Sequence, residues 1–130
     1  MKKILIVEDN EENRILIRDI LQHFGYEAIE AKNGEEGIRI AKEHKPVLTL
    51  MDIQMPVLDG LSAIKALRAD PETKNMKIIA LTSFSMKGDR EKAIEAGADE
   101  YMSKPINTRK LMKVIERILG EEEKGGSEER

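Results

Sequence analysis

Residues 48–60 read LTLMDIQMPVLDG, an apolar run that ends on one carboxylate, Asp52, before Pro56 and Gly60 turn the chain. Continuous apolarity, without polar alternation, is typical of a strand covered on both faces of a parallel sheet. An acid at the end of such a strand could cap a helix, bind a metal or react. Residues elsewhere in the chain help to distinguish these roles.

Strand and helix patterns alternate along the whole chain. The segments with strand character are 4–7, 47–51 and 78–81, with 26–29 and 100–102 as weaker candidates. Helical patterns cover 11–24, about 33–44, about 60–69, about 87–96 and the segment after Asn107. Because five strand–helix units follow one another with short connections, we expect an α/β fold of three layers with a parallel five-stranded sheet.

Composition limits the function classes. The 130 residues suit one domain, which we place at 1–120, followed by a disordered acidic tail at 121–130. This tail holds five acids and two bases, while residues 1–120 hold 20 of each, so we expect no binding to nucleic acid by bulk charge. Cysteine is absent, which excludes disulfides and thiolate zinc sites. No signal peptide or membrane span is apparent, so we expect a cytoplasmic protein.

Charged and hydroxyl side chains follow four of the predicted strands. The strand ends carry Glu8-Asp9, Asp52, Thr82 and, after the last strand, Lys104. Carboxyl ends of parallel strands meet at one edge of the sheet, where such folds bind ligands. Three clustered acids repel one another and require either raised pKa values or a cation, and oxygen ligands without His or Cys suit Mg²⁺. A carboxylate beside a cation and a lysine can act as a nucleophile toward a phosphoryl group.

These residues also resemble a known family. Glu8-Asp9, Met51-Asp52 with the following MPVLDG, Leu81-Thr82-Ser83 and Lys104-Pro105 are similar to the signature of the response-regulator receiver domain. The match covers about residues 2–120. The resemblance implies a doubly wound, flavodoxin-like (βα)5 sheet with strand order 2-1-3-4-5. The segment 84–89 is similar to cell-division-type single-domain regulators and to receivers of hybrid kinases.

The resemblance implies a role for each site residue. Asp52 would accept a phosphoryl group from a phosphohistidine donor, so the chain is a phospho-acceptor that assists its own phosphorylation and dephosphorylation, not a turnover enzyme. Mg²⁺ would bind Asp9 and Asp52 directly, Glu8 through water, and the backbone carbonyl of Gln54. Glu8 replaces the commoner Asp of the family. The implied contacts of the phosphoryl oxygens are Thr82 and Lys104.

The resemblance further implies a switch and protein partners. Pro105 would follow a cis peptide bond that directs Lys104 inward, and Tyr101 would turn inward on phosphorylation. The partners would be a sensor histidine kinase or a histidine phosphotransfer protein, and a downstream protein target, since no output domain follows residue 120. The implied target surface includes Lys87, Arg90, Tyr101, Ile106 and Lys110. We expect a monomer, with dimerisation on phosphorylation as an alternative.

One helix suggests where the phosphodonor docks. Leu16, Ile17, Ile20, Leu21 and Phe24 form a stripe that we expect to face the core. Ile15 falls nearly opposite this stripe, near the edge that carries Asp9. We therefore expect Ile15 to be exposed and to contact the donor.

Other interpretations of the same residues stay open. Asp9 or Asn10 could cap the first helix, Thr82 and Ser83 could cap the fourth, and Lys104-Pro105 could be an ordinary turn.

Aspartate-nucleophile phosphohydrolases also place Asp, Thr and Lys at strand ends, but they usually carry a second acid where this chain has Gln54. An interaction module that has lost phosphorylation would lack Asp52, Thr82 or Lys104, and all three are present.

Overall fold

Five strands alternate with five helices in the computed structural model, which describes residues 2–55, 58–82 and 88–128, with side chains through residue 120. In chain order they are β1 Lys3–Val7, α1 Glu11–His23, β2 Glu27–Ala31, α2 Gly34–His44, β3 Leu48–Asp52, α3 Gly60–Ala69, β4 Lys77–Thr82, α4 Asp89–Ala96, β5 Glu100–Ser103 and α5 Thr108–Glu128. Each predicted strand and helix is present, with bounds shifted by a few residues.

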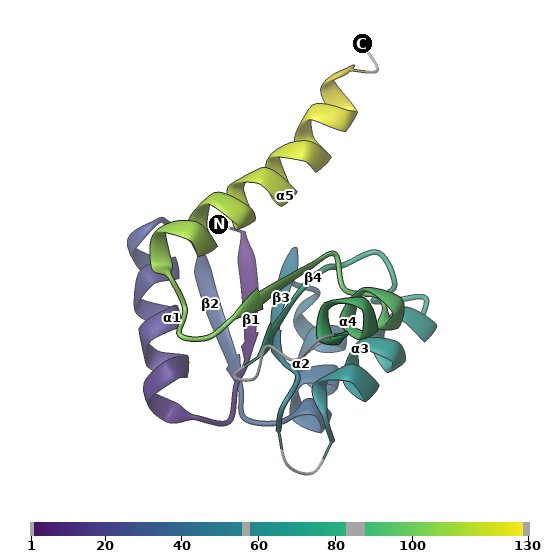
Figure 1. Cartoon of the computed structure of the whole chain (residues 1–130). Coiled ribbons are helices and arrows are strands. Elements are labelled where there is room, and N and C mark those ends of the chain that lie inside the picture. The colour runs from purple at the N-terminus through teal and green to yellow at the C-terminus, as the bar shows by residue number, and fades with distance from the viewer. Residues whose placement is uncertain (1, 56–57, 83–87, 129–130) are drawn as a thin grey trace.

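The strands form one parallel sheet in the order β2-β1-β3-β4-β5, which confirms the expected topology. The register places Val7 opposite Met51 and Thr82 opposite Ser103. The carboxyl ends of β1, β3, β4 and β5 are therefore level with one another. These carboxyl ends lie together at one edge of the sheet (Figure 1).

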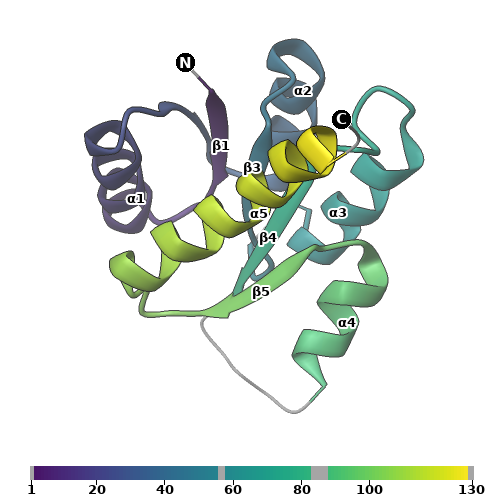
Figure 2. The ribbon, with the colours of Figure 1, turned by 90° about the horizontal axis from the view of Figure 1, so that it is seen from above.

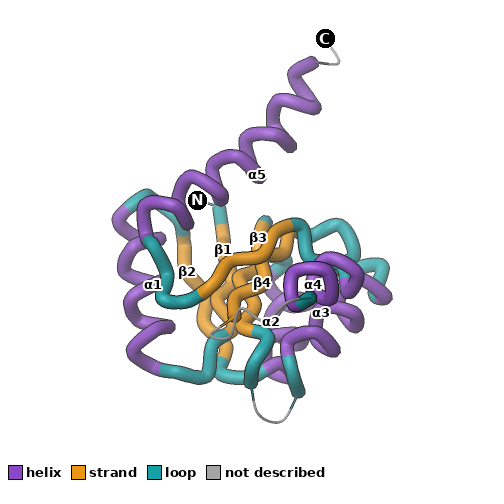
Figure 3. The backbone as a smooth tube through the Cα atoms, in the orientation of Figure 1, coloured by secondary structure: helices purple, strands orange, loops and turns teal. Residues whose placement is uncertain are grey.

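Helices cover both faces of the sheet. Figures 1 and 2 show α1 and α5 on one face and α2, α3 and α4 on the other, and Figure 3 shows the strands enclosed between these two layers. Alternate residues of a strand belong to two hydrophobic cores, one on each face of the sheet. Leu5 and Val7 of β1 pack toward α2 and α3, while Ile4 and Ile6 pack toward α1 and α5. Every residue of β3 is buried. This two-sided burial explains why the central strands β1, β3 and β4 are largely apolar instead of alternating.

Side-chain caps and glycines set the helix ends. The side chains of Asn10, Asn33 and Asp59 each accept a backbone N–H three residues on, at 2.9 Å, and so begin α1, α2 and α3. Gly25 and Gly97 follow α1 and α4 with φ of 88° and 123°, a region that favours glycine. The alternative that Asn10 caps α1 is therefore confirmed, and the alternative that Asp9 caps it is wrong.

Helix α1 is rotated relative to the expected stripe. Leu16 and Phe24 were expected to be buried, but they are 46% and 51% exposed, whereas Ile15 is half-buried. The prediction for these three residues is therefore wrong. The buried residues of the helix are Arg14, Ile17 and Leu21. Arg14 is buried although it is charged, because oxygen atoms at that position accept its hydrogen bonds. Hydrophobic periodicity contains no information about such partners.

Helix α5 is longer than expected. Its backbone is helical through Glu128, and its far end projects away from the sheet (Figure 1). The helix thus passes residue 120, where we expected the folded domain to end. The boundary at residue 120 and a disordered tail beyond it stay predictions.

Candidate functional site

Three acids converge at the carboxyl edge of the sheet. Asp52 is the last residue of β3 and is 2% exposed; Glu8 directly follows β1 and is fully buried. Asp9 is exposed. One carboxylate oxygen from each of the three lies within 4.8 Å of the others. The predicted convergence of these acids is therefore confirmed.

Lys104 lies against two of these acids. Its backbone N–H donates to the carbonyl of Thr82 at 2.6 Å, and the following peptide bond to Pro105 is cis, as expected. Its ammonium Nζ donates to Oε1 of Glu8 and, at 3.2 Å, to Oδ2 of Asp52. The side chain of Lys104 is only 10% exposed. The lysine therefore points into the site, and the interpretation of Lys104-Pro105 as an ordinary surface turn is wrong.

The loop after β3 holds the second oxygen of Asp52. The backbone N–H of Gln54 donates to Oδ1 of Asp52 at 3.0 Å. The N–H of Gly60 donates to the carbonyl of Ile53 at 3.3 Å, so α3 starts directly against the end of the strand. A Cβ at position 60 would collide with backbone atoms of Asp52 and Ile53. Both oxygens of the Asp52 carboxylate are thus fixed, one by the local turn and one by Lys104.

Burial and charge perturb two groups of the site. Burial raises the pKa of Glu8, and the neighbouring Asp52 raises it further, although contact with Lys104 opposes the change. Burial lowers the pKa of Lys104, but contact with Glu8 and attraction to Asp52 outweigh this effect, so its pKa is raised. Oε2 of Glu8 also accepts the N–H of Asn10 at 3.2 Å. The site therefore keeps its lysine charged beside crowded carboxylates.

Thr82 ends β4 at the same edge of the sheet. It is fully buried and pairs in register with Ser103, the residue before Lys104. The capping interpretation of Thr82 is wrong, because Gly88 is the residue that precedes α4. Ser83 and the predicted surface residue Lys87 lie outside the described residues.

The predicted target surface is partly assembled beside the site. Arg90, Tyr101 and Lys110 line one hollow of about 330 Å³ between α4, β5 and α5. The ring of Tyr101 packs against the core, and its buried hydroxyl has no hydrogen-bond partner among the described residues. Ile106 is half-buried against the core of α1 and α5. Arg90, Tyr101 and Lys110 thus lie on one face. Ile106 also contributes to the packing of the core.

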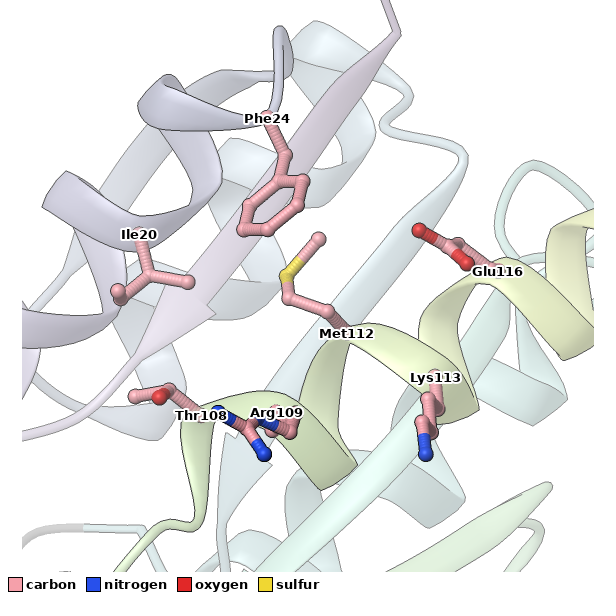
Figure 4. A pocket seen from close by; sticks show the side chains of 7 residues that line it. All are labelled: Ile20, Phe24, Thr108, Arg109, Met112, Lys113 and Glu116. Carbon is pink, nitrogen blue, oxygen red and sulfur yellow. The ribbon is translucent and has the colours of Figure 1, made fainter.

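A groove between α1 and α5 was not predicted from the sequence. Ile20, Phe24 and Met112 form its apolar part, and Arg109 and Lys113 of α5 lie along it (Figure 4). Its volume is about 360 Å³. Leu16, one helical turn before Ile20 on α1, is also exposed. The exposed apolar face of α1 is therefore Leu16 and Phe24, and not Ile15 as expected.

The described residues contain no helix both long enough and apolar enough to cross a membrane.

Comparison with known proteins gives a consistent result. The family model for the response regulator receiver domain matches residues 4–116. The polar-differentiation response regulator DivK of Brucella anthropi is 44% identical over 120 residues, which are 92% of this chain and 98% of that protein. The receiver domain of a Pseudomonas aeruginosa sensor histidine kinase, with a magnesium ion coordinated in its active site cleft, is 36% identical, with a TM-score of 0.85 over 92% of this chain and 98% of that one.

A third relative was solved with a partner. It is the receiver domain of a Saccharomyces cerevisiae response regulator in a co-crystal with its histidine phosphotransfer protein. This domain is 34% identical, with a TM-score of 0.83 over 88% of this chain and 86% of that one. The fold, the site and these matches together show that the chain belongs to the response regulator receiver domain family of two-component signal transduction.

Proposed function

We propose that the chain is a magnesium-dependent phosphoryl acceptor, phosphorylated on Asp52 by a phosphohistidine donor, and that phosphorylation switches a partner-binding surface. The observation that carries this proposal is the position of Lys104, whose ammonium contacts both Glu8 and Asp52 in a nearly buried site. A nucleophilic carboxylate that is held between a turn N–H and an ammonium is oriented before the donor arrives.

The residues of the site suit in-line transfer. An oxygen of Asp52 forms a bond to phosphorus while the bond from phosphorus to the donor imidazole nitrogen breaks. The electron pair leaves with that nitrogen, and an acyl phosphate remains on Asp52. Lys104 supplies a positive charge beside the phosphoryl oxygens, and Thr82 supplies a hydroxyl. Water can later attack the same phosphorus, which returns the carboxylate and releases inorganic phosphate.

The acid cluster suits magnesium. Carboxylate oxygens of Glu8, Asp9 and Asp52 lie within 4.8 Å of one another, and among the described residues no His or Cys joins this cluster. Such hard donors fit Mg²⁺, which would offset the negative charge of the phosphoryl oxygens. We expect Asp9 and Asp52 to bind directly and the Gln54 carbonyl to complete the protein ligands.

Two faces are available for protein partners. A sensor kinase or histidine phosphotransfer protein would dock over α1 at Leu16 and Phe24, which are exposed and apolar. The solved complex of a receiver with a histidine phosphotransfer protein supports a partner of this class. The downstream target would bind the hollow lined by Arg90, Tyr101 and Lys110. A cytoplasmic location and a monomeric state stay predictions.

Labelling with acetyl phosphate and Mg²⁺, followed by intact mass measurement, tests the proposal. We expect wild type to gain one phosphoryl group and Asp52→Asn to gain none. Asp59→Asn is the matched control, because Asp59 is an exposed acid of the same loop and asparagine is an equally good helix cap. Labelling of Asp52→Asn at the wild-type level would contradict the assignment. Steady hydrolysis of phosphate esters by wild type would instead favour a phosphohydrolase.

A further inference from the structure

Arg14 is a buried charge on the inner face of α1. Its side chain is 10% exposed, and charged residues are rarely so buried unless they are paired. The guanidinium Nε donates to Oε1 of Glu30 on β2 at 3.0 Å. Its Nη1 donates to the backbone carbonyl of Glu8 at 3.0 Å. The planar fork of arginine therefore reaches two oxygens from different segments at once, which lysine cannot match.

The hydrogen bond from Arg14 to the carbonyl of Glu8 concerns the candidate magnesium site directly. The carbonyl of Glu8 belongs to the peptide that joins Glu8 to Asp9, two of the three clustered acids. On one side of this peptide, the N–H of Glu8 donates to the carbonyl of Ala31 at 3.1 Å. On the other side, Asn10 begins α1. Because Asp9 is exposed, the direction of its carboxylate depends on how this short stretch of backbone is held.

We infer that Arg14 is a positioning residue for magnesium binding, because it fixes the peptide between Glu8 and Asp9. This inference rests on the proposed function. Groups that orient metal ligands without touching the metal typically change metal affinity about 10–100-fold when they are removed. Arg14 also ties α1 to β2 through Glu30, so a purely structural role predicts a change in stability alone. Metal affinity and stability must therefore be measured separately.

The test compares two arginines of the same helix. Arg14→Met removes every side-chain donor and keeps an unbranched side chain. Arg18→Met is the matched control, since Arg18 also lies near Glu30, at 3.7 Å, but its hydrogen bonds are to Asp19. Isothermal titration of the full chain with Mg²⁺ gives the Kd, and thermal melting by circular dichroism gives the stability. Acetyl phosphate labelling is followed over a range of Mg²⁺ concentrations.

We expect R14M to bind Mg²⁺ about tenfold more weakly, equivalent to about 1.4 kcal/mol, while R18M binds as wild type does. The Mg²⁺ concentration for half-maximal labelling should rise by the same factor, with the maximal rate retained. Arg14→Lys keeps a charged donor and should recover part of the affinity; it also replaces R14M if that variant does not fold.

Two results would overturn the inference. One is an R14M variant with wild-type Mg²⁺ affinity; the other is equal weakening in R14M and R18M. A wild-type chain that binds no Mg²⁺ and gains no phosphoryl group would instead refute the proposed function itself. The two failures are thus distinguishable in one set of measurements.

Discussion

Replacement of Lys104 by methionine should destabilise the domain strongly at neutral and alkaline pH. The variant leaves Glu8 and Asp52, which are 0% and 2% exposed, without the ammonium between them. At 3.2 Å and an effective dielectric constant of about 20, the attraction between Lys104 and Asp52 is about 5 kcal/mol. The cost of burying the ammonium offsets part of this attraction. We expect a net loss of about 3 kcal/mol, at the lower end of the range for breaking a buried ion pair.

The stability that K104M loses relative to wild type should depend on pH in a defined direction. The pKa of Glu8 is already raised above 4.5 in the wild type, and removal of Lys104 removes the contact that lowers it. Between the unfolded and the folded pKa of Glu8, the folded variant therefore holds a proton that the unfolded chain releases. Its stability should fall as the pH rises from the unfolded pKa of Glu8 through the higher folded pKa. Lower pH thus reduces the loss, because a protonated carboxyl no longer repels its neighbour.

Urea denaturation at pH 5 and pH 8, followed by circular dichroism, measures both effects. Lys65→Met is the control, because Lys65 is an exposed lysine of α3. Added Mg²⁺ should stabilise K104M more than wild type, since the cation replaces the missing charge. A K104M variant as stable as wild type at pH 8, or one with the same deficit at both pH values, would refute the reasoning.

Three further substitutions test the surroundings of the site. Asp59→Ala should lower the free energy of unfolding in urea by about 1 kcal/mol, because it removes the cap of α3. The hydrogen bonds to Ser62 lower the pKa of Asp59, so this loss should vanish as the pH falls through that pKa. Gly60→Ala should cost about 1–3 kcal/mol and reduce phosphoryl labelling, because its Cβ meets the backbone of Asp52. Gly120→Ala, with open space around it in the interior of α5, should instead stabilise the domain by up to about 1 kcal/mol. Tyr101→Phe should be neutral or stabilising by up to about 1 kcal/mol, because the lost hydroxyl is buried without a partner among the described residues; a loss of stability would reveal a hydrogen bond of that hydroxyl.

The sheet and its reactive edge could be predicted because their signals are local. The central strands β1, β3 and β4 are buried on both faces, so each appears as an apolar run, and the polar residue at or after its end marks the carboxyl end. Parallel pairing then brings Asp9, Asp52, Thr82 and Lys104 to one edge, although they are far apart in the chain. The inward direction of Lys104 and its cis peptide bond came from family resemblance, and the structure confirms both.

The rotation of α1 could not be predicted from periodicity. A hydropathy pattern scores Leu16 as a core residue and Arg14 as a surface residue, whereas the structure exposes the first and buries the second. The burial of Arg14 depends on oxygens of Glu8 and Glu30, which reach it only when β1 and β2 pair. The groove beside Phe24 likewise depends on how α5 packs against α1 (Figure 4). Contacts of this kind exist only in the assembled fold.

Lys104 also suggests how a charge at Asp52 can affect the neighbouring target surface. Oδ1 of Asp52 is held by a neighbour in sequence, but Oδ2 is held by a lysine of the loop between β5 and α5. A phosphoryl group on Asp52 changes the charge that Lys104 faces, and with it the balance between its contacts to Asp52 and Glu8. The residues on either side of this lysine, Ser103 and Pro105, line a hollow together with Tyr101. We therefore expect a change at Asp52 to reach the candidate target surface through Lys104 and the backbone on either side of it.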